Sequence, residues 1–324
     1  MMQRTMQRMG KMSTAKKFKK MHKATEKLET QLQSNLKKEY KKAFDAIRLE
    51  ILKAENRGFL SATEFYKYQR DKKLMQEINS ILKNITAMDN QHFKTYLANQ
   101  YENNYFGTGF IMETEYQAKL AYRHLDRKAV RQTVVSPLTN ISLQNNRARV
   151  LQSIRSTLAQ AAIKGDSLAV INRNIKKDLE TNANNSLRIA RTETTTIAGK
   201  GQQESMEHAE KKLPIIKKWI ATLDGRTRDR HGDMDGETVP VDKPFSNGLM
   251  YPGDQSGDAA EVINCRCTME TVIEGYENAS QYRRAKGLDG KNKVIPQTTY
   301  KDWIKNRVTY ILQIMPLLTN CQKV

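Results

Sequence analysis

Apolar residues recur at steps of three and four through residues 14–56. This spacing places them on one face of an α-helix and predicts a single long amphipathic helix. The apolar face consists of Leu28, Leu32, Leu36, Tyr40, Phe44, Ile47 and Ile51. Eight lysines lie off that face: Lys16, Lys17, Lys19, Lys20, Lys37, Lys38, Lys41 and Lys42. The lysine-rich side is either a solvated helix surface or a surface that follows DNA phosphates.

The helical period continues through the first two-thirds of the chain. Further helices are predicted at residues 61–83, 113–132 and 145–164, from 168 onwards, and from about 185 to 210. A polar stretch at 84–104 and the Gly107/Gly109 pair are expected to interrupt the period, because glycine disfavours helix interiors. Gly165 is expected to end one helix, and Asp166 or Ser167 to cap the next.

After Pro214 the period changes from that of a helix to that of a strand. Trp219, Ala221 and Leu223 alternate with other residues, and residues 262–273 alternate again. In the second run one face is expected to carry Ile263, Cys265, Cys267, Met269 and Ile273. Asp235-Gly236 is typical of a turn between strands.

These periods predict an α+β fold, with a mainly helical N-terminal two-thirds and a small β-containing C-terminal module. Four consecutive segments are expected along the chain. They are a basic helical arm at residues 1–60, a helical middle region at 61–145, a folded module at 146–275 and a basic C-terminal tail at 276–324.

The charge supports a role in binding a polyanion. The chain has 55 Lys and Arg against 35 Asp and Glu, a formal net charge of +20. The excess lies at the ends, with net +10 over residues 1–57 and +7 over 281–324, whereas residues 224–261 carry net −5. We therefore expect the ends to contact double-stranded DNA through its phosphates, without reading sequence. An acidic protein surface is the other partner that fits this charge.

Cysteine content and hydropathy favour a reducing, aqueous compartment. There are three cysteines, an odd number, and two of them are only two residues apart, which argues against a disulfide framework. The basic N-terminal residues lack an apolar core of the kind found in signal peptides, and no apolar run approaches the length of a membrane span. A reducing cytosol is the expected compartment, with no membrane partner.

An ordered set of short motifs lies between the last predicted helix and residue 267. It begins with Ala-Arg-Thr-Glu at 190–193 and continues with Trp219, Asp-Gly-Arg-Thr-Arg at 224–228 and His231. An Asp-Gly turn, Phe245, Pro-Gly-Asp at 252–254 and Asn-Cys-Arg-Cys at 264–267 complete it. In this order the motifs resemble the phage head morphogenesis family, the minor head proteins typified by the SPP1 gene 7 product and the Mu F protein. The resemblance covers roughly residues 150–275, about two-fifths of the chain.

The resemblance implies a minor head protein inside the virion head near the portal, with the portal protein and capsid or scaffold proteins as partners. Family members bind DNA and affect its packaging or exit. The resemblance also implies a structural network at the family's motif positions, which here are Arg191, Glu193, Trp219, Asp224, Arg226, Arg228, His231, Gly236, Asn264 and Arg266.

His231, Cys265 and Cys267 form a candidate metal site, since imidazole and thiolates suit zinc. Many relatives carry Cys-x-x-Cys where this chain has residues 228–231, and His-Pro where it has Val262-Ile263. Three soft ligands remain, with Asp224 or Asp235 as a possible fourth. The favoured interpretation is that both cysteines are small buried core residues and that no cofactor is bound, with zinc as the alternative.

The acidic and basic residues near His231 also allow two interpretations. Asp224 beside Arg226 and Arg228 favours bidentate ion pairs that fix a turn-rich module. The rival interpretation is a metal-assisted nuclease or toxin-like effector centred on His231. Because the set lacks a clear pair of nucleophile and base, we expect a binding protein and not an enzyme.

Overall fold

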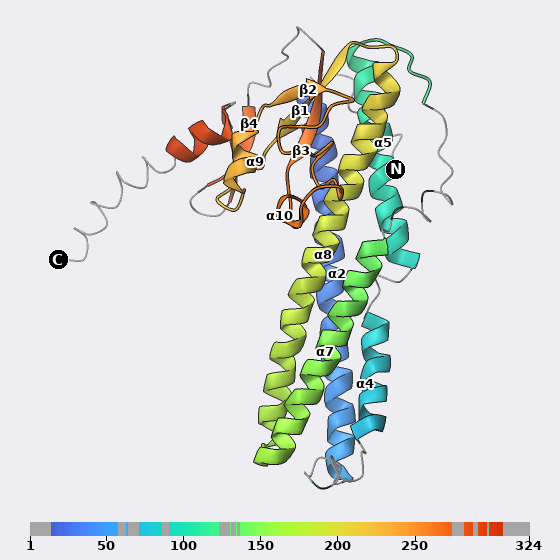
Figure 1. The fold of residues 1–324 in the computed structure, drawn as a ribbon, viewed down its shortest axis with the longest axis vertical. Coiled ribbons are helices and arrows are strands. Elements are labelled where there is room, and N and C mark those ends of the chain that lie inside the picture. The colour runs from blue at the N-terminus through green and yellow to red at the C-terminus, as the bar shows by residue number, and fades with distance from the viewer. Residues whose placement is uncertain are drawn as a thin grey trace, which may run out of the picture. The chain divides into compact units, whose positions relative to one another are not determined.

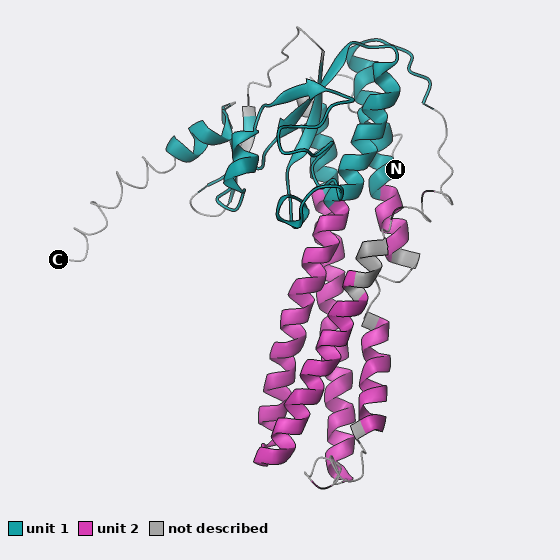
Figure 2. Ribbon diagram, in the orientation of Figure 1, with its two compact units in different colours: residues 1–25, 100–124, 195–324 teal, residues 26–99, 125–194 magenta. Residues whose placement is uncertain are grey.

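The computed structural model describes residues 14–57, 63, 71–85, 91–122, 130, 134, 137–273, 282–287, 291–296 and 298–306 (Figure 1). The chain divides into two compact units (Figure 2). Unit 1 comprises residues 1–25, 100–124 and 195–324, and unit 2 comprises residues 26–99 and 125–194. The α+β prediction is confirmed, because helices dominate the first two-thirds and the strands lie after residue 214. The four-segment division stays a prediction.

Unit 2 is a helical bundle around one apolar core. Its helices are parts of α2 (Thr14–Asn56), α5 (Gln91–Glu115) and α8 (Leu168–Glu210), together with α4 (Asp71–Ile85) and α7 (Pro137–Lys164). The predicted apolar face of α2 contributes Tyr40, Ile47 and Ile51 to this core, and the other helices contribute residues such as Ile78, Ile154 and Ile175. The three- and four-residue period therefore identified the packed face of α2 correctly.

Two predicted interruptions of helices are wrong. Gly107 and Gly109 lie inside α5 (Gln91–Glu115). A Cβ on Gly109 would lie 2.5 Å from the Tyr122 ring, so this glycine allows close packing and does not end the helix. The expected boundary near residue 185 is absent as well, because α8 continues without a break from Leu168 to Glu210.

Several helix ends also differ from the prediction. The helix predicted at 113–132 stops at Glu115, and Gln117 and Ala121 take positive φ values of 48° and 54°. Helix α7 begins at Pro137, before the predicted start at 145, because the first turn of a helix tolerates proline. Most of residues 61–70 lie outside the described residues, and α4 covers the later part of the helix predicted at 61–83.

The junction between α7 and α8 follows the predicted signals. Gly165 has φ +68°, the left-handed conformation that ends many helices. The Ser167 carbonyl accepts hydrogen bonds from the backbone N–H groups of Val170 (2.9 Å) and Ile171 (3.0 Å). Ser167, and not Asp166, therefore occupies the N-cap position of α8.

Unit 1 contains a three-stranded antiparallel sheet of order β2-β1-β3. The strands are β1 (Ile215–Ile220), β2 (Thr238–Pro240) and β3 (Thr268–Ile273). Residues of β1 alternate between buried and half-buried, as the period-two pattern predicts, and Trp219 pairs with Met269 across to β3. Trp219, Phe245 and Met269 are fully or almost fully buried in the core of this unit.

The strand predicted at 262–273 is only half as long as expected. Its first residue belongs to the short helix α10 (Ala259–Val262), and Asn264 has φ +61°, which a strand does not accommodate. Ile263 is 41% exposed and does not share the buried side with the cysteines. Cys265 and Cys267 nevertheless both point inward, from the segment just before β3.

Part of the predicted basic tail is folded within unit 1. Strands β4 (Tyr282–Lys286) and β5 (Asn292–Pro296) form a hairpin, and residues 300–306 are helical. Ala285, Tyr300 and Trp303 bury their side chains together with Leu223. Residues 307–324 lie outside the described residues. Among the described helices, we find none that combines the length and the apolar character needed to cross a bilayer.

Candidate functional site

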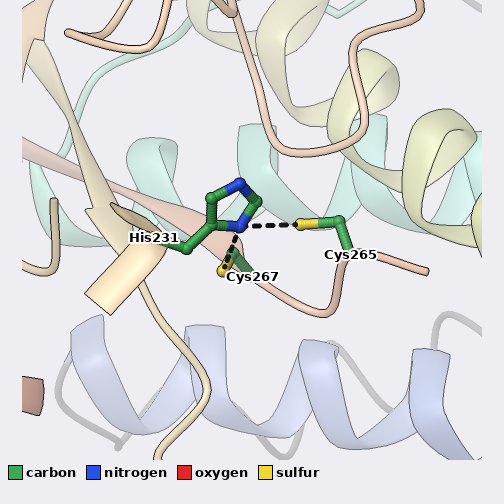
Figure 3. A group of neighbouring side chains, drawn as sticks. All are labelled: His231, Cys265 and Cys267. Atoms are coloured by element: carbon green, nitrogen blue, oxygen red, sulfur yellow. Dashed lines mark hydrogen bonds between the residues drawn. The ribbon is translucent and has the colours of Figure 1, made fainter. Parts of the chain in front are cut away.

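The motif-rich segment of residues 219–267 brings one imidazole and two thiols together (Figure 3). His231 lies on the short helix α9 (Asp229–Asp233), and both cysteines lie between α10 and β3. The His231 Nδ1 atom is 3.6 Å from Cys265 Sγ and 3.5 Å from Cys267 Sγ. All three residues are buried, with exposed fractions of 1%, 1% and 6%. The sequence prediction that these residues approach one another therefore agrees with the geometry.

Glu261 fixes the orientation of the His231 ring. The two are joined by a hydrogen bond of 2.9 Å from His231 Nε2 to Glu261 Oε2. Because an ionised carboxylate only accepts hydrogen bonds, Nε2 carries the proton, and in neutral His231 the Nδ1 lone pair faces the two sulfurs. Asn247 Nδ2 donates to the same carboxylate oxygen at 3.2 Å, and Arg230 approaches the other oxygen at 3.3 Å. Both contacts stabilise the carboxylate.

The titration of these groups reflects their mutual contacts. Burial alone would lower the pKa of His231, but Cys265 and Glu261 outweigh burial and raise it above its usual value. A hydrogen bond from Cys267 holds the pKa of Cys265 well below that of an ordinary thiol, and the same bond raises the pKa of Cys267 well above it. The hydrogen bond between the two cysteines therefore shifts the pKa values of their thiols in opposite directions.

A bidentate ion pair holds the Cys-Arg-Cys segment from the outside. Arg266, which lies between the two cysteines, donates to both carboxylate oxygens of Asp224, with 2.9 Å from Nη2 to Oδ1. The backbone N–H of Arg226 also donates to Asp224 Oδ1, at 2.9 Å. Burial would raise the pKa of Asp224, but Arg266 and Arg226 outweigh it and lower that pKa. The bidentate partner of Asp224 is thus Arg266, and not Arg226 or Arg228 as the sequence suggested.

The backbone carbonyls of the same segment are held as well. Thr195 Oγ1 donates to the Cys265 carbonyl at 2.8 Å, and Thr222 Oγ1 donates to the Arg266 carbonyl at 2.6 Å. Arg228 donates from Nη2 to the Ile263 carbonyl. Side chains from three parts of unit 1 therefore fix the position of the two thiols.

Other residues of the predicted network lie in different surroundings. Trp219 is fully buried, with its ring edge-on to His231 at 5.4 Å between centroids. Gly236 has φ +92° and donates its N–H to the Trp219 carbonyl, which confirms the predicted turn. Arg191 lies in unit 2, where it forms an ion pair of 2.8 Å with Glu29, and Glu193 is buried in the same unit.

The two carboxylates that were suggested as a fourth metal ligand are engaged elsewhere. Asp224 pairs with Arg266, and Asp235 accepts hydrogen bonds from Arg283 and from the backbone N–H of Ala221 at 2.8 Å. Among the described residues, the group of possible metal ligands consists of the imidazole and the two thiols.

Sequence reasoning missed two contacts of this unit. Glu261 lies on α10, and only its acidic character beside the Asn-Cys-Arg-Cys motif pointed to the His231 contact. The ion pair of Asp235 with Arg283 joins residues 48 positions apart. No local pattern predicts such a pair, and it removes Arg283 from the set of cations available to a ligand.

The lysines proposed for DNA contact divide into different groups. Lys37, Lys38, Lys41 and Lys42 are exposed on α2, and Lys19 and Lys20 are half-buried. Lys17 is only 1% exposed, because its ammonium group pairs with Glu115 at 2.6 Å and donates to Thr114 at 2.9 Å. Lys17 therefore does not lie on the exposed side of α2, contrary to the prediction. The side chain of Lys16 lies outside the described residues.

Comparison with known proteins places the motifs in a family. Residues 152–270 match the family described as Phage Mu protein F like protein. The chain is 27% identical over 293 residues to the Minor head protein GP7 of Bacillus phage SPP1, and the alignment covers 86% of this chain and 93% of that protein. No solved structure matches the chain significantly.

Two bacterial proteins are similar as well. The chain is 29% identical over 269 residues to a protein of Enterococcus faecalis named NAD(+)--arginine ADP-ribosyltransferase EFV; the alignment covers 81% of this chain and 54% of that protein. It is 26% identical over 128 residues to the Uncharacterized protein YqbB of Bacillus subtilis, with 37% and 41% covered. The motifs and these matches agree: over most of its length the chain is similar to a protein of the phage head morphogenesis family, and its Mu F-like region lies at residues 152–270.

Proposed function

We propose that this chain acts as a minor head protein of a tailed phage, a virion component that takes part in head morphogenesis. The observation that carries the proposal is the similarity to a minor head protein over 86% of this chain and 93% of that relative. We further propose that the protein associates with the portal vertex, contacts capsid or scaffold proteins, and binds double-stranded DNA non-specifically during packaging or exit.

The burial of His231 favours binding over catalysis. Its side chain is 2% exposed, with one ring nitrogen against the two sulfurs and the other on Glu261. A general base must come within hydrogen-bond reach of a substrate proton, and this ring has no exposed edge for such a contact. The activity in the name of the Enterococcus relative is not part of the proposal, because the chain spans only 54% of that protein.

The DNA-binding part of the proposal rests on charge and exposure. The formal net charge is +20, and four exposed lysines lie within six residues of α2. Lys37 and Lys41 are one helical turn apart, as are Lys38 and Lys42, so each pair projects from one side of the helix. Such a surface can contact phosphates without reading bases.

Binding to unrelated DNA duplexes across a salt series tests this proposal. Each lysine that neutralises a phosphate contributes about 0.9 to the slope of log affinity against log salt concentration. Replacing Lys37, Lys38, Lys41 and Lys42 by Gln should therefore reduce the slope by up to about 3.6, with equal effect on every duplex. The change is measured by fluorescence anisotropy of labelled duplexes.

A variant with the same change in charge provides the control. Lys72, Lys73, Lys164 and Lys177 are exposed on other helices of unit 2, and their replacement by Gln should leave most of the slope intact. Equal losses in both variants would assign the effect to overall charge and contradict the role of α2. An absence of binding by the unmodified chain at low salt would remove DNA from the proposal.

A further inference from the structure

The His231, Cys265 and Cys267 cluster has the geometry of a zinc site (Figure 3). Zinc binds thiolate sulfur at about 2.3 Å and imidazole nitrogen at about 2.0–2.1 Å, so a tetrahedral ion separates N from S by about 3.5 Å. The two N···S distances here are 3.6 and 3.5 Å. Both N···S distances therefore match those between ligands of a single tetrahedral zinc ion, and all three ligand atoms lie within 4.8 Å of one another.

Hydrogen bonds within the cluster cannot satisfy the imidazole nitrogen and both sulfurs at the same time. The Nδ1 atom of neutral His231 offers one lone pair, whereas two sulfurs lie at the same short distance from it. Only one S–H group can direct its proton along that lone pair. A cation that shares the lone pair and both sulfurs would satisfy the nitrogen and the two thiolates together.

The surroundings of His231 match those of a histidine that binds metal. A metal-binding histidine commonly donates its second ring N–H to a carboxylate, which fixes the tautomer and the ring orientation. Glu261 accepts this hydrogen bond at 2.9 Å, and Asn247 and Arg230 hold the Glu261 carboxylate in turn. The thiol side is equally fixed, because the Asp224–Arg266 pair and Thr195 position the segment that carries the sulfurs.

We propose that His231 Nδ1, Cys265 Sγ and Cys267 Sγ bind one zinc ion, with Glu261 as the residue that orients the histidine. The fourth position is taken by water. The ion would connect α9 to the segment before β3, and so stabilise a small module that is rich in turns.

Metal content and cobalt substitution of the full chain test the proposal. The chain, purified under reducing conditions without added chelator, should contain one zinc ion per molecule by mass spectrometry of the metals. Removal of zinc and addition of Co²⁺ should produce the visible bands of a tetrahedral site and the ultraviolet bands of thiolate ligation. A reduced chain that contains no zinc and shows no such bands with Co²⁺ would overturn the proposal.

Single substitutions identify the ligands. His231→Asn, Cys265→Ser and Cys267→Ser should each lose the bound zinc, whereas Cys321→Ser and His208→Asn should keep it. Glu261→Gln keeps all three ligands and should weaken zinc binding by roughly 10–100-fold, measured by competition with a chromophoric chelator. This variant gives a readout even if the ligand variants fail to fold. Zinc retained in Cys265→Ser and Cys267→Ser but lost in Cys321→Ser would contradict the assignment.

Discussion

At the scale of single residues, the sequence did not show how a buried charged side chain is accommodated. Lys217 lies on the buried side of β1, with no exposed surface, between Ile215 and Trp219. Its ammonium group donates to Gln203 Oε1 at 3.1 Å and to the Met250 carbonyl at 2.7 Å, and it lies 5.2 Å from the centre of the Phe245 ring. The alternating pattern placed this position inside, but only the partners explain how a cation is accommodated there.

The stability of the protein should carry a pH dependence from Lys217. Burial lowers its pKa from 10.5 to about 8, against the opposing effect of Glu207 and Asp242. Between these two pH values the unfolded chain binds more protons at this residue than the folded chain, so its contribution to the free energy of unfolding rises with pH. Relative to Lys217→Met, the unmodified protein should gain about 2 kcal/mol over this range. Chemical denaturation at a series of pH values measures the difference.

The control for this prediction is Lys243→Met, because the Lys243 side chain is 64% exposed. This variant should follow the unmodified protein over the same pH range. If the free energies of unfolding of Lys217→Met and of the unmodified protein change in parallel between pH 8 and 10.5, the pKa of Lys217 is not lowered in the folded chain.

At the scale of elements, glycines within helices serve packing. Gly199 lies inside α8, where a Cβ would be 2.6 Å from the Pro252 carbonyl oxygen and 2.8 Å from the Tyr251 ring. Gly253 of the same loop has φ +84° and approaches the preceding turn of α8, where a Cβ added to it would lie 2.9 Å from the Thr196 backbone nitrogen. The Pro-Gly-Asp motif of the family is thus the place where a loop of unit 1 contacts α8.

Gly199→Ala should therefore destabilise the protein, although alanine usually stabilises a helix relative to glycine. Alanine gains about 1 kcal/mol over glycine in a helix interior. At Gly199 the contact with the Pro252 backbone should outweigh this gain and give a net loss of about 1–3 kcal/mol. Gly225→Ala, at a position with no atom within 4 Å of the added Cβ, should change stability by less than about 0.5 kcal/mol. Thermal denaturation of both variants compares them, and a more stable Gly199→Ala would contradict the packing role.

At the scale of the whole molecule, the apolar residues are divided between separate cores. One core contains Ile154 and other buried residues of α2, α4, α7 and α8, and another contains Met269 and the residues around the sheet of unit 1. Each core is completed by residues from distant parts of the sequence, because α2, α5 and α8 each contribute residues to both units. Each unit is therefore built from segments that are far apart along the chain.

Mutations in the two cores should affect different amides. Ile154→Ala and Met269→Ala each remove buried apolar volume and should cost about 2–5 kcal/mol in the unit that contains them. Hydrogen exchange followed by mass spectrometry should show faster exchange in α4 and α7 for Ile154→Ala, and in β1 and β3 for Met269→Ala. Equal acceleration in both units for both variants would show one cooperative structure instead.

The sequence alone determined the features that depend on neighbouring residues. The apolar face of α2, the stop at Gly165, the alternation of β1 and the Asp235-Gly236 turn follow from periods and backbone preferences that act over a few residues. The ordered motifs determined the family in the same way. Close packing is different, since the need for glycine at positions 109 and 199 arises from residues that approach these helices from elsewhere in the chain.

The tertiary structure decided which partners complete the polar contacts, although the motifs had already grouped His231 with Cys265 and Cys267 as a candidate metal site. Cys265 and Cys267 were placed on a buried side for the wrong reason, since the positive φ of Asn264 excludes a continuous strand. The approach of His231 across more than 30 positions, and the carboxylate of Glu261 behind it, depend on how α9 and α10 fold against the sheet. Contacts between groups far apart in sequence have no periodic signature, because they depend on the path of the whole chain and not on its local conformation.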